Sequence, residues 1–293
     1  MTRRLELRTG YFGDRPSFLA LVDLLFDTFE IDIGQLDRMG GPGPTSMPFG
    51  YFDEAGRCVA NFSAFSMPLV IDGRRARAVG YQSGAVRPEY RGKGLYRDLM
   101  QRAFGWAEAE GFELGLLLTD KPGLYEPYGF RIVEQHMFMG TVPAAATAQP
   151  CRHLSIESDE DVKLIRSILA ERMPVSERFA VAGQAVEFLL NGCFDPSIRL
   201  SHMADHDAVV AWREEAGTFH LLDIAGRDIP SLAQVVSALK PSAERIAVYF
   251  STDRLDWNGE AERYEGSCEL MVAGDVSGLL KCGPVMLSPM TDF

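Results

Sequence analysis

The sequence lacks the features that mark membrane, disulfide-stabilised and metal-binding proteins. Its five cysteines are scattered with no Cys-x-x-Cys pair, so neither a zinc site nor a disulfide framework is predicted. No apolar run approaches the roughly 18 residues that a membrane helix needs, and the start, Met1 to Arg8, has no apolar signal core. We therefore expect a cytoplasmic protein with no metal and no membrane partner.

Positive charge is also scarce. The 293 residues include 29 Lys and Arg against 41 Asp and Glu, which gives a net charge of −12. Binding to nucleic acid depends on clustered cationic side chains, so we expect no nucleic-acid partner. The acidic balance favours a cationic small-molecule or peptide acceptor without naming one. The length exceeds that of one typical domain and suggests two.

The most informative segment is a glycine-rich turn between a predicted strand and a predicted helix. Residues 85–98 read Ala-Val-Arg-Pro-Glu-Tyr-Arg-Gly-Lys-Gly-Leu-Tyr-Arg-Asp. Gly92 and Gly94 permit a tight turn, and a helix beginning near Leu95 directs its free N–H groups and positive dipole end at a ligand. The cationic side chains beside these donors are Arg91, Lys93 and Arg97. The spacing fits neither a Walker A loop nor a dinucleotide fingerprint, and it predicts a pyrophosphate site.

This segment resembles the pyrophosphate-binding signature of the GNAT superfamily of acetyl-CoA-dependent N-acetyltransferases, Arg/Gln-x-x-Gly-x-Gly/Ala. Arg91 and Gly94 match it, whereas Tyr96 stands where the signature has a small residue. A second match, Leu-Tyr-Glu-Pro-Tyr-Gly-Phe at 124–130, resembles the family's Tyr-x-x-x-Gly-Phe turn. Before it come a helix pattern and a buried-strand pattern, at Leu95–Gly111 and Leu114–Leu118.

The resemblance implies an α/β fold with a mixed sheet and assigns the site residues. The strand ending at Val86 would carry a bulge, splay from 114–118, and let pantetheine bind as an extra strand. Tyr125 would be the general acid, since a phenol with a pKa of about 10 stays protonated and can protonate the leaving thiolate. The residues expected to bind acetyl-CoA are Gly84, Ala85, Val86, Arg91, Gly92, Lys93, Gly94, Leu95, Tyr96 and Arg97.

The segment 143–150 is alanine-rich with a proline at each end and predicts a linker. We expect a complete GNAT domain at 1–147 and a degenerate GNAT-like domain at 148–293. In the second, the turn at 225–230 has one glycine and an acidic residue near the helix start, so no CoA is expected there.

The other predicted elements follow from periodicity and turn signals. In the first half these are strands at Leu5–Arg8, Val59–Ile71 and Arg77–Val86, a helix at Pro16–Phe29, and a hairpin turn at Asp72-Gly73. The region Ile132–Thr141 has a strand pattern. In the second half they are helices at 158–173, 183–191 and 230–239, and strands at 198–203, 208–213, 219–224, 245–250 and 268–272.

The tandem halves resemble Eis-like acetyltransferases without their sterol-carrier-like domain. In that group the terminal carboxylate enters the active site, which makes the carboxylate of Phe293 a candidate base. Other candidates are Asp27, Glu30, Asp32 and His136. The function expected is direct acetyl transfer to a primary amine of a small molecule or peptide. A non-catalytic acyl-CoA sensor is the alternative, and the oligomeric state stays open, with a homo-oligomer among the options.

Overall fold

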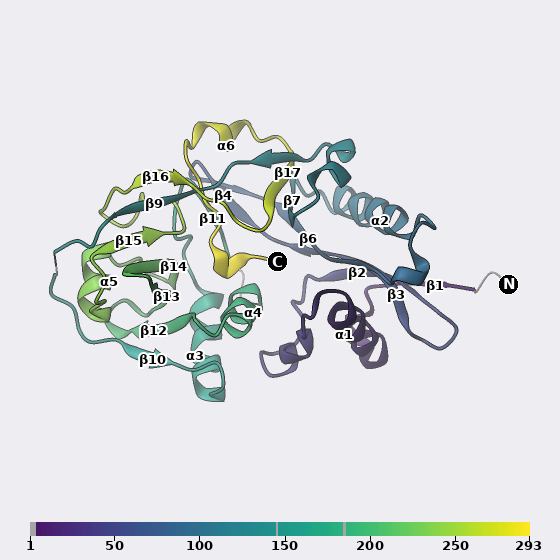
Figure 1. The fold of residues 1–293 in the computed structure, drawn as a ribbon, viewed down its shortest axis with the longest axis horizontal. Helices are drawn as coiled ribbons and strands as arrows, with labels where there is room; N and C mark the ends of the chain where they lie inside the picture. Colours follow the sequence, from purple (N-terminus) through teal and green to yellow (C-terminus); the bar gives the residue numbers. More distant parts are fainter. Residues whose placement is uncertain (1–3, 145, 184–185) are drawn as a thin grey trace. The chain divides into compact units, whose positions relative to one another are not determined.

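The computed structural model describes residues 4–144, 146–183 and 186–293 (Figure 1). Ala145 of the predicted linker, Gln184 and Ala185 of the predicted helix 183–191, and the first three residues of the chain lie outside this part. The chain forms two compact units. Unit 1 comprises Met1–Ser66, Arg77–Leu118 and Phe293, and unit 2 comprises Met67–Ala76 and Thr119–Asp292. The domain division at residue 147/148 stays a prediction.

Unit 1 is built on a mixed β-sheet whose strands lie in the order β1-β2-β3-β6-β7. The first four strands pair antiparallel, and β6 and β7 are parallel. A parallel pair needs a crossover, which α2 supplies between β6 and β7. The strands are β1 (Glu6–Thr9), β2 (Met47–Phe52), β3 (Cys58–Ser66), β6 (Ala78–Val86) and β7 (Leu114–Thr119).

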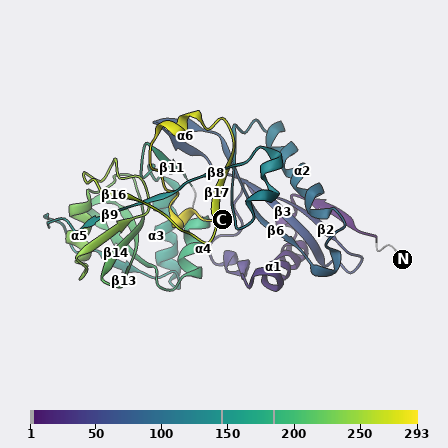
Figure 2. The same cartoon turned by 45° about the horizontal axis from the view of Figure 1, so that its top comes forward.

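Two helices cover opposite faces of this sheet, as Figure 2 shows from a second side. Helix α1 (Arg15–Phe29) begins at Asp14, whose carboxylate accepts a hydrogen bond from the Ser17 N–H, and has Pro16 in its first turn. Both features are typical of helix starts. Helix α2 (Leu95–Ala109) follows β6. Leu21, Leu24 and Leu25 of α1 pack into the core against the sheet, so the apolar stripe of α1 holds it in place.

Unit 2 contains a second mixed sheet, in the order β10-β12-β13-β14-β15-β9-β16. Only β14 and β15 pair parallel within it. Its strands are β9 (His136–Thr141), β10 (Arg152–Leu154), β12 (Arg199–Met203), β13 (Ala208–Glu215), β14 (Thr218–Gly226), β15 (Arg245–Val248) and β16 (Glu260–Arg263). The unit also contains β8 (Arg131–Val133) and β17 (Glu269–Gly274), which pair antiparallel with each other. Its helices are α3 (Asp159–Ala170), α4 (Val186–Phe194), α5 (Leu232–Leu239) and α6 (Ser277–Lys281).

The succession β14, α5, β15 repeats the arrangement β6, α2, β7 of unit 1: a strand, a crossover helix and a parallel neighbour. The α/β fold with mixed sheets predicted from the sequence is confirmed. None of the helices in the described residues is long and apolar enough to cross a membrane.

Two predicted strands are wrong, because each pattern forms two separate strands. The pattern Val59–Ile71 forms two strands, because the chain leaves β3 after Ser66 and the segment with Pro68 joins another sheet. There β4 (Leu69–Ile71) pairs with β5 (Arg74–Ala76) and with β11 (Phe179–Val181). The hairpin turn at Asp72-Gly73 is confirmed, with φ of 50° and 72° at the two positions, as a tight hairpin requires. The strand pattern 132–141 is likewise divided into β8 and β9.

Candidate functional site

The glycine-rich turn forms an open helix N-terminus, as predicted. Gly92 and Gly94 have φ of 72° and 78°, in the left-handed region, which glycine adopts without a Cβ penalty. Gly94 is the N-cap of α2, and no side chain in the described residues hydrogen-bonds there as a cap. The start of α2 therefore directs the positive end of the helix dipole at a ligand without a competing side-chain cap.

Two cationic side chains of the turn contact backbone carbonyls near them, and Lys93 Nζ also lies 4.7 Å from the centroid of the Tyr90 ring. Arg91 Nε donates to the Val86 carbonyl at 3.1 Å, and Lys93 Nζ donates to the Glu89 carbonyl at 3.0 Å. Both side chains are exposed, as is Arg97. Exposed hydrogen bonds of this kind contribute little free energy, so each cation can turn toward an anionic ligand at small cost.

Tyr96, which departs from the family signature, packs against Gly84 on β6. A Cβ at position 84 would lie 3.0 Å from Tyr96 Cε2 and would overlap the hydroxyl. The ring also lies edge-on to Phe62, with the centroids 5.6 Å apart. The absence of a side chain at Gly84 thus makes room for Tyr96 in the first turn of α2, which keeps strand and helix in close contact.

Strand β6 carries a bulge, as expected from the resemblance. Asn61 pairs with Ala85 and Ser63 with Gln82, so one residue of β3, Phe62, spans two residues of β6. The second of these, Gly84, follows Ser83, whose φ is 58°. Such a bulge adds a residue and bends the strand.

Strand β6 pairs with β7 over only part of its length. Pairing of β6 with β7 runs only from Ala78 to Gly80, opposite Leu114 to Leu116. Beyond Gly80 the two strands have no registered pairs, although β6 continues to Val86. Backbone groups on this side of residues 84–86 are therefore placed to pair with an extended ligand, by the same geometry as an added strand.

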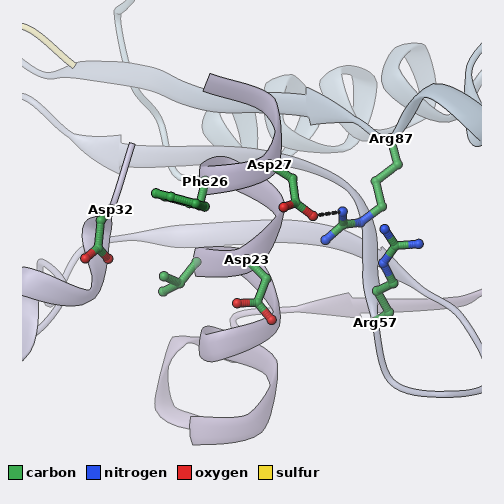
Figure 3. Close-up of a pocket in the computed structure, with 7 residues that line it drawn as sticks. Asp23, Phe26, Asp27, Asp32, Arg57 and Arg87 are labelled. Atoms are coloured by element: carbon green, nitrogen blue, oxygen red, sulfur yellow. Dashed lines mark hydrogen bonds and ion pairs between the residues drawn. The ribbon is translucent and has the colours of Figure 1, made fainter. Parts of the chain in front are cut away.

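Directly after β6, Arg87 is a buried cation that sequence reasoning missed as a site residue. Its side chain is 3% exposed, Nε donates to the Cys58 carbonyl at 2.8 Å, and the guanidinium forms an ion pair with Asp27 of α1 (Figure 3). The Arg87 N–H also donates to the Val59 carbonyl at 2.9 Å. Strand β3, helix α1 and the loop entrance are joined through this one residue, and its position in the sequence among other basic residues gave no sign of burial.

A cavity of about 440 Å³ lies beside this ion pair. Figure 3 shows the residues around it, which are Val22, Asp23, Phe26, Asp27, Asp32, Arg57 and Arg87. Two of the three acidic candidates for a general base lie here. The hydrogen bond from Arg87 lowers the pKa of Asp27, which makes it a weak base. Asp32 accepts the Gly34 N–H at 2.8 Å, and Glu30 ends α1 in a left-handed conformation.

Of the remaining candidates, Tyr125 and His136 belong to unit 2 and Phe293 belongs to unit 1. Tyr125, in unit 2, is buried at the junction of two 3₁₀ turns, η4 (Pro122–Leu124) and η5 (Glu126–Tyr128), with its ring centroid 6.1 Å from that of Phe130. His136 is partly buried on β9, and its Nδ1 has no hydrogen-bond partner among the described residues. In unit 1, the Phe293 ring lies edge-on to Phe65 at 5.2 Å. The catalytic roles of Tyr125 and Phe293 stay predictions.

The loop after β14 is built differently from the loop after β6. Helix α5 starts with a capping box in which Ser231 and Gln234 satisfy each other's backbone N–H groups, so these donors are occupied. Strand β14 also has an extra residue, Leu222, opposite Ala211 and Trp212. Here Ser288 Oγ donates to the Leu222 carbonyl at 3.0 Å. The Ser288 hydroxyl thus occupies the bulge of β14, whereas β6 has no registered pairs with β7 beyond Gly80.

Together, a helix start without a side-chain cap and a bulged strand that diverges from its parallel neighbour define an α/β protein with a candidate site for an extended anionic ligand. Residues 42–133 match the family model described as the acetyltransferase (GNAT) domain. This part of the chain is thus a GNAT domain by similarity, as its motifs predicted.

Similar proteins agree with this assignment. An uncharacterized N-acetyltransferase of Streptomyces griseus is 28% identical over 185 residues, which cover 58% of this chain and 44% of the relative. The chain thus matches less than half the length of that relative. Among solved structures, a probable N-acyltransferase of Enterococcus faecalis V583 has a TM-score of 0.61 at 15% identity and covers 96% of this chain and 74% of its own. Eis1 from Mycobacterium abscessus has a TM-score of 0.59 at 13% identity, over 95% of this chain and 76% of its own. These two show the fold.

Proposed function

We propose that the protein is an acetyl-CoA-dependent N-acetyltransferase that transfers an acetyl group directly to a primary amine of a small molecule or peptide. The observation that carries the proposal is the combination of two features. The start of α2 at Gly94 has no side-chain cap in the described residues, and residues 84–86 of β6 have no registered pairs with β7. The pyrophosphate of CoA would accept hydrogen bonds from the loop and the α2 N-terminus, with Arg91 and Lys93 as cations. The pantetheine arm would pair with the backbone of residues 84–86.

In the proposed reaction the amine nitrogen forms a bond to the thioester carbonyl carbon, and the carbon–sulfur bond of the tetrahedral intermediate then breaks. The departing thiolate takes the phenol proton of Tyr125, and the proton lost by the amine passes to a base or to water. A primary amine with an ordinary pKa of about 10.4 must be neutral to attack, so turnover should rise with pH through the neutral range.

The first test is acetyl-CoA binding by calorimetry, followed by a panel of amines with free-thiol release as the readout. Arg91→Glu and Gly94→Glu place negative charge where the pyrophosphate is expected and should abolish measurable binding. Wild-type affinity in either variant would refute the proposed site.

Tyr125→Phe separates catalysis from binding alone. It removes only the hydroxyl, so acetyl-CoA should bind as before while thiol release falls by about 10²-fold or more. A protein that binds acetyl-CoA only as a signal would show no amine-dependent thiol release in the wild type, and this result would overturn the enzymatic proposal.

A further inference from the structure

A buried chain of hydrogen bonds lies beneath the bulge of β6. Tyr11 Oη donates to Asn61 Oδ1 at 2.5 Å, and Asn61 Nδ2 donates to the Ser63 hydroxyl at 3.0 Å and to the Ser83 carbonyl at 2.9 Å. Asn61 and Ser63 are buried in β3, and Tyr11 is buried in η1 (Tyr11–Gly13). All three contacts lie within unit 1.

The orientation of the Asn61 amide is determined by its partners. A backbone carbonyl only accepts hydrogen bonds, so the amide atom that faces the Ser83 carbonyl must be the nitrogen. Oδ1 then faces Tyr11, whose hydroxyl can donate. Tyr11 is held in turn by its edge-on contact with Phe52, at 5.1 Å between centroids, and by Gly50, where a Cβ would lie 3.0 Å from the ring.

This series of hydrogen bonds ends at Ser83, the residue of the bulge that has an unfavourable backbone conformation. Ser83 has φ of 58°, and left-handed backbone is disfavoured for a residue with a Cβ. The Asn61 amide bonds the carbonyl of that same residue. A hydrogen bond made in a buried site offsets such a cost, because the alternative would leave the amide without a partner. Neither the loop nor α2 takes part in this chain.

We propose that Tyr11 and Asn61 are positioning residues for the coenzyme, which hold Ser83 in the left-handed conformation and so direct residues 84–86 toward the pantetheine arm. This inference rests on the proposed function, because it assigns to acetyl-CoA the backbone edge that the bulge exposes. Neither side chain touches the coenzyme. They affect acetyl-CoA affinity through the backbone of β6. If Ser83 returns to an extended conformation, the register beyond it shifts, and the backbone groups of residues 84–86 are no longer aligned with the pantetheine arm.

The test uses Asn61→Leu, which has a similar size and lacks the amide. Acetyl-CoA affinity measured by calorimetry should fall about tenfold, the equivalent of one lost hydrogen bond and the strain it offsets. The deciding variant is Asn61→Leu combined with Ser83→Gly. Glycine adopts the left-handed conformation without the amide's help, so the double variant should recover most of the lost affinity. A loss caused only by disturbed core packing would not be recovered.

Ser17→Ala is the matched control. Ser17 is also buried in unit 1 and hydrogen-bonded, to Asp14 and Arg8, but it lies at the start of α1 and should lower thermal stability without changing acetyl-CoA affinity. Tyr11→Phe replaces Asn61→Leu should the latter fail to fold; it removes one donor and should weaken binding about threefold, again recovered by Ser83→Gly. Unchanged affinity in these variants, or a loss that Ser83→Gly does not recover, overturns the proposal.

A second readout needs no coenzyme. Amide hydrogen exchange at Gly84 and Ala85 should be faster in Asn61→Leu and return toward the wild-type rate with Ser83→Gly. If wild-type protein binds no acetyl-CoA, the proposed function fails and the positioning role fails with it. If wild-type protein binds and only the exchange or affinity pattern is absent, the positioning role alone is wrong.

Discussion

Tyr96 and Gly84 occupy one space: the tyrosine ring lies where a side chain at position 84 would have to be. The two residues are on different elements, the first turn of α2 and the bulge of β6. A large residue at the start of α2 is therefore matched by the absence of a side chain in the strand, and the pair keeps this helix start close to the bulge of β6.

Gly84→Ala should consequently reduce stability by about 1–3 kcal/mol, the usual effect of overpacking, and should weaken acetyl-CoA binding. Adding Tyr96→Ala to Gly84→Ala should restore part of the affinity, because it frees the space. Denaturant unfolding and calorimetry measure the two quantities. If the double variant binds no better than Gly84→Ala alone, the two residues do not compete for that space.

Gly94 in the loop and Gly56 outside it have the same left-handed backbone conformation, so alanine at either position should carry the same backbone cost. Gly94→Ala and Gly56→Ala both place a Cβ where φ is near 80° and where no atom lies within 4 Å, so each should cost about 1 kcal/mol of stability. Gly94→Ala should weaken acetyl-CoA binding about tenfold, because its Cβ stands before the first N–H groups of α2. Gly56→Ala lies between β2 and β3 and should bind normally. Equal binding by both variants would contradict the assignment of the loop.

The ion pair of Arg87 with Asp27 predicts a pH dependence of stability. The hydrogen bond from Arg87 lowers the Asp27 pKa in the folded state. Its stabilising contribution is therefore complete above the ordinary value of 3.8 and is lost as pH falls through the lowered value. Asp27→Asn should lower the thermal midpoint near pH 6 and differ little from wild type in strong acid. Asp23→Asn, one turn earlier on α1, is the control, and a pH-independent difference for Asp27→Asn would refute this account.

Glu187 on α4 predicts the opposite pH dependence. It is buried, one carboxylate oxygen has no hydrogen-bond partner among the described residues, and burial raises its pKa from 4.5 to about 7. Between these values the folded protein retains a proton that the unfolded chain has lost, so its contribution falls as pH rises and the full cost is present above pH 7. Glu187→Gln should match wild type near pH 4 and be more stable at pH 8, by about 3 kcal/mol at most.

Urea unfolding at the two pH values measures this difference. Glu262→Gln, on the exposed strand β16, is the control and should change stability little at either pH. Equal stability of wild type and Glu187→Gln at pH 8 would show that the carboxylate is not desolvated.

The sequence by itself determined the loop and the pattern of the fold. Gly92 and Gly94 are predictable as left-handed positions, because glycine in a turn between a strand and a helix indicates φ above zero. The apolar period of residues 16–29 predicts the bounds of α1 to within one residue. The strand, loop, helix and strand from Ala78 to Thr119 are local in the chain. Local backbone preferences and periodicity therefore suffice for them.

Only the tertiary structure decided which distant residues support the bulge of β6 that precedes that loop. Tyr11, Asn61 and Ser83 are separated by 50 and 22 positions along the chain. The Asn61 amide reaches the Tyr11 hydroxyl and the Ser83 backbone carbonyl only because η1, β3 and β6 are brought together by the fold. The burial of Arg87 and the break of the predicted strand at 59–71 also depend on which sheet each segment joins. Pairing of strands far apart in sequence depends on the whole core, since each segment alone is compatible with several partners.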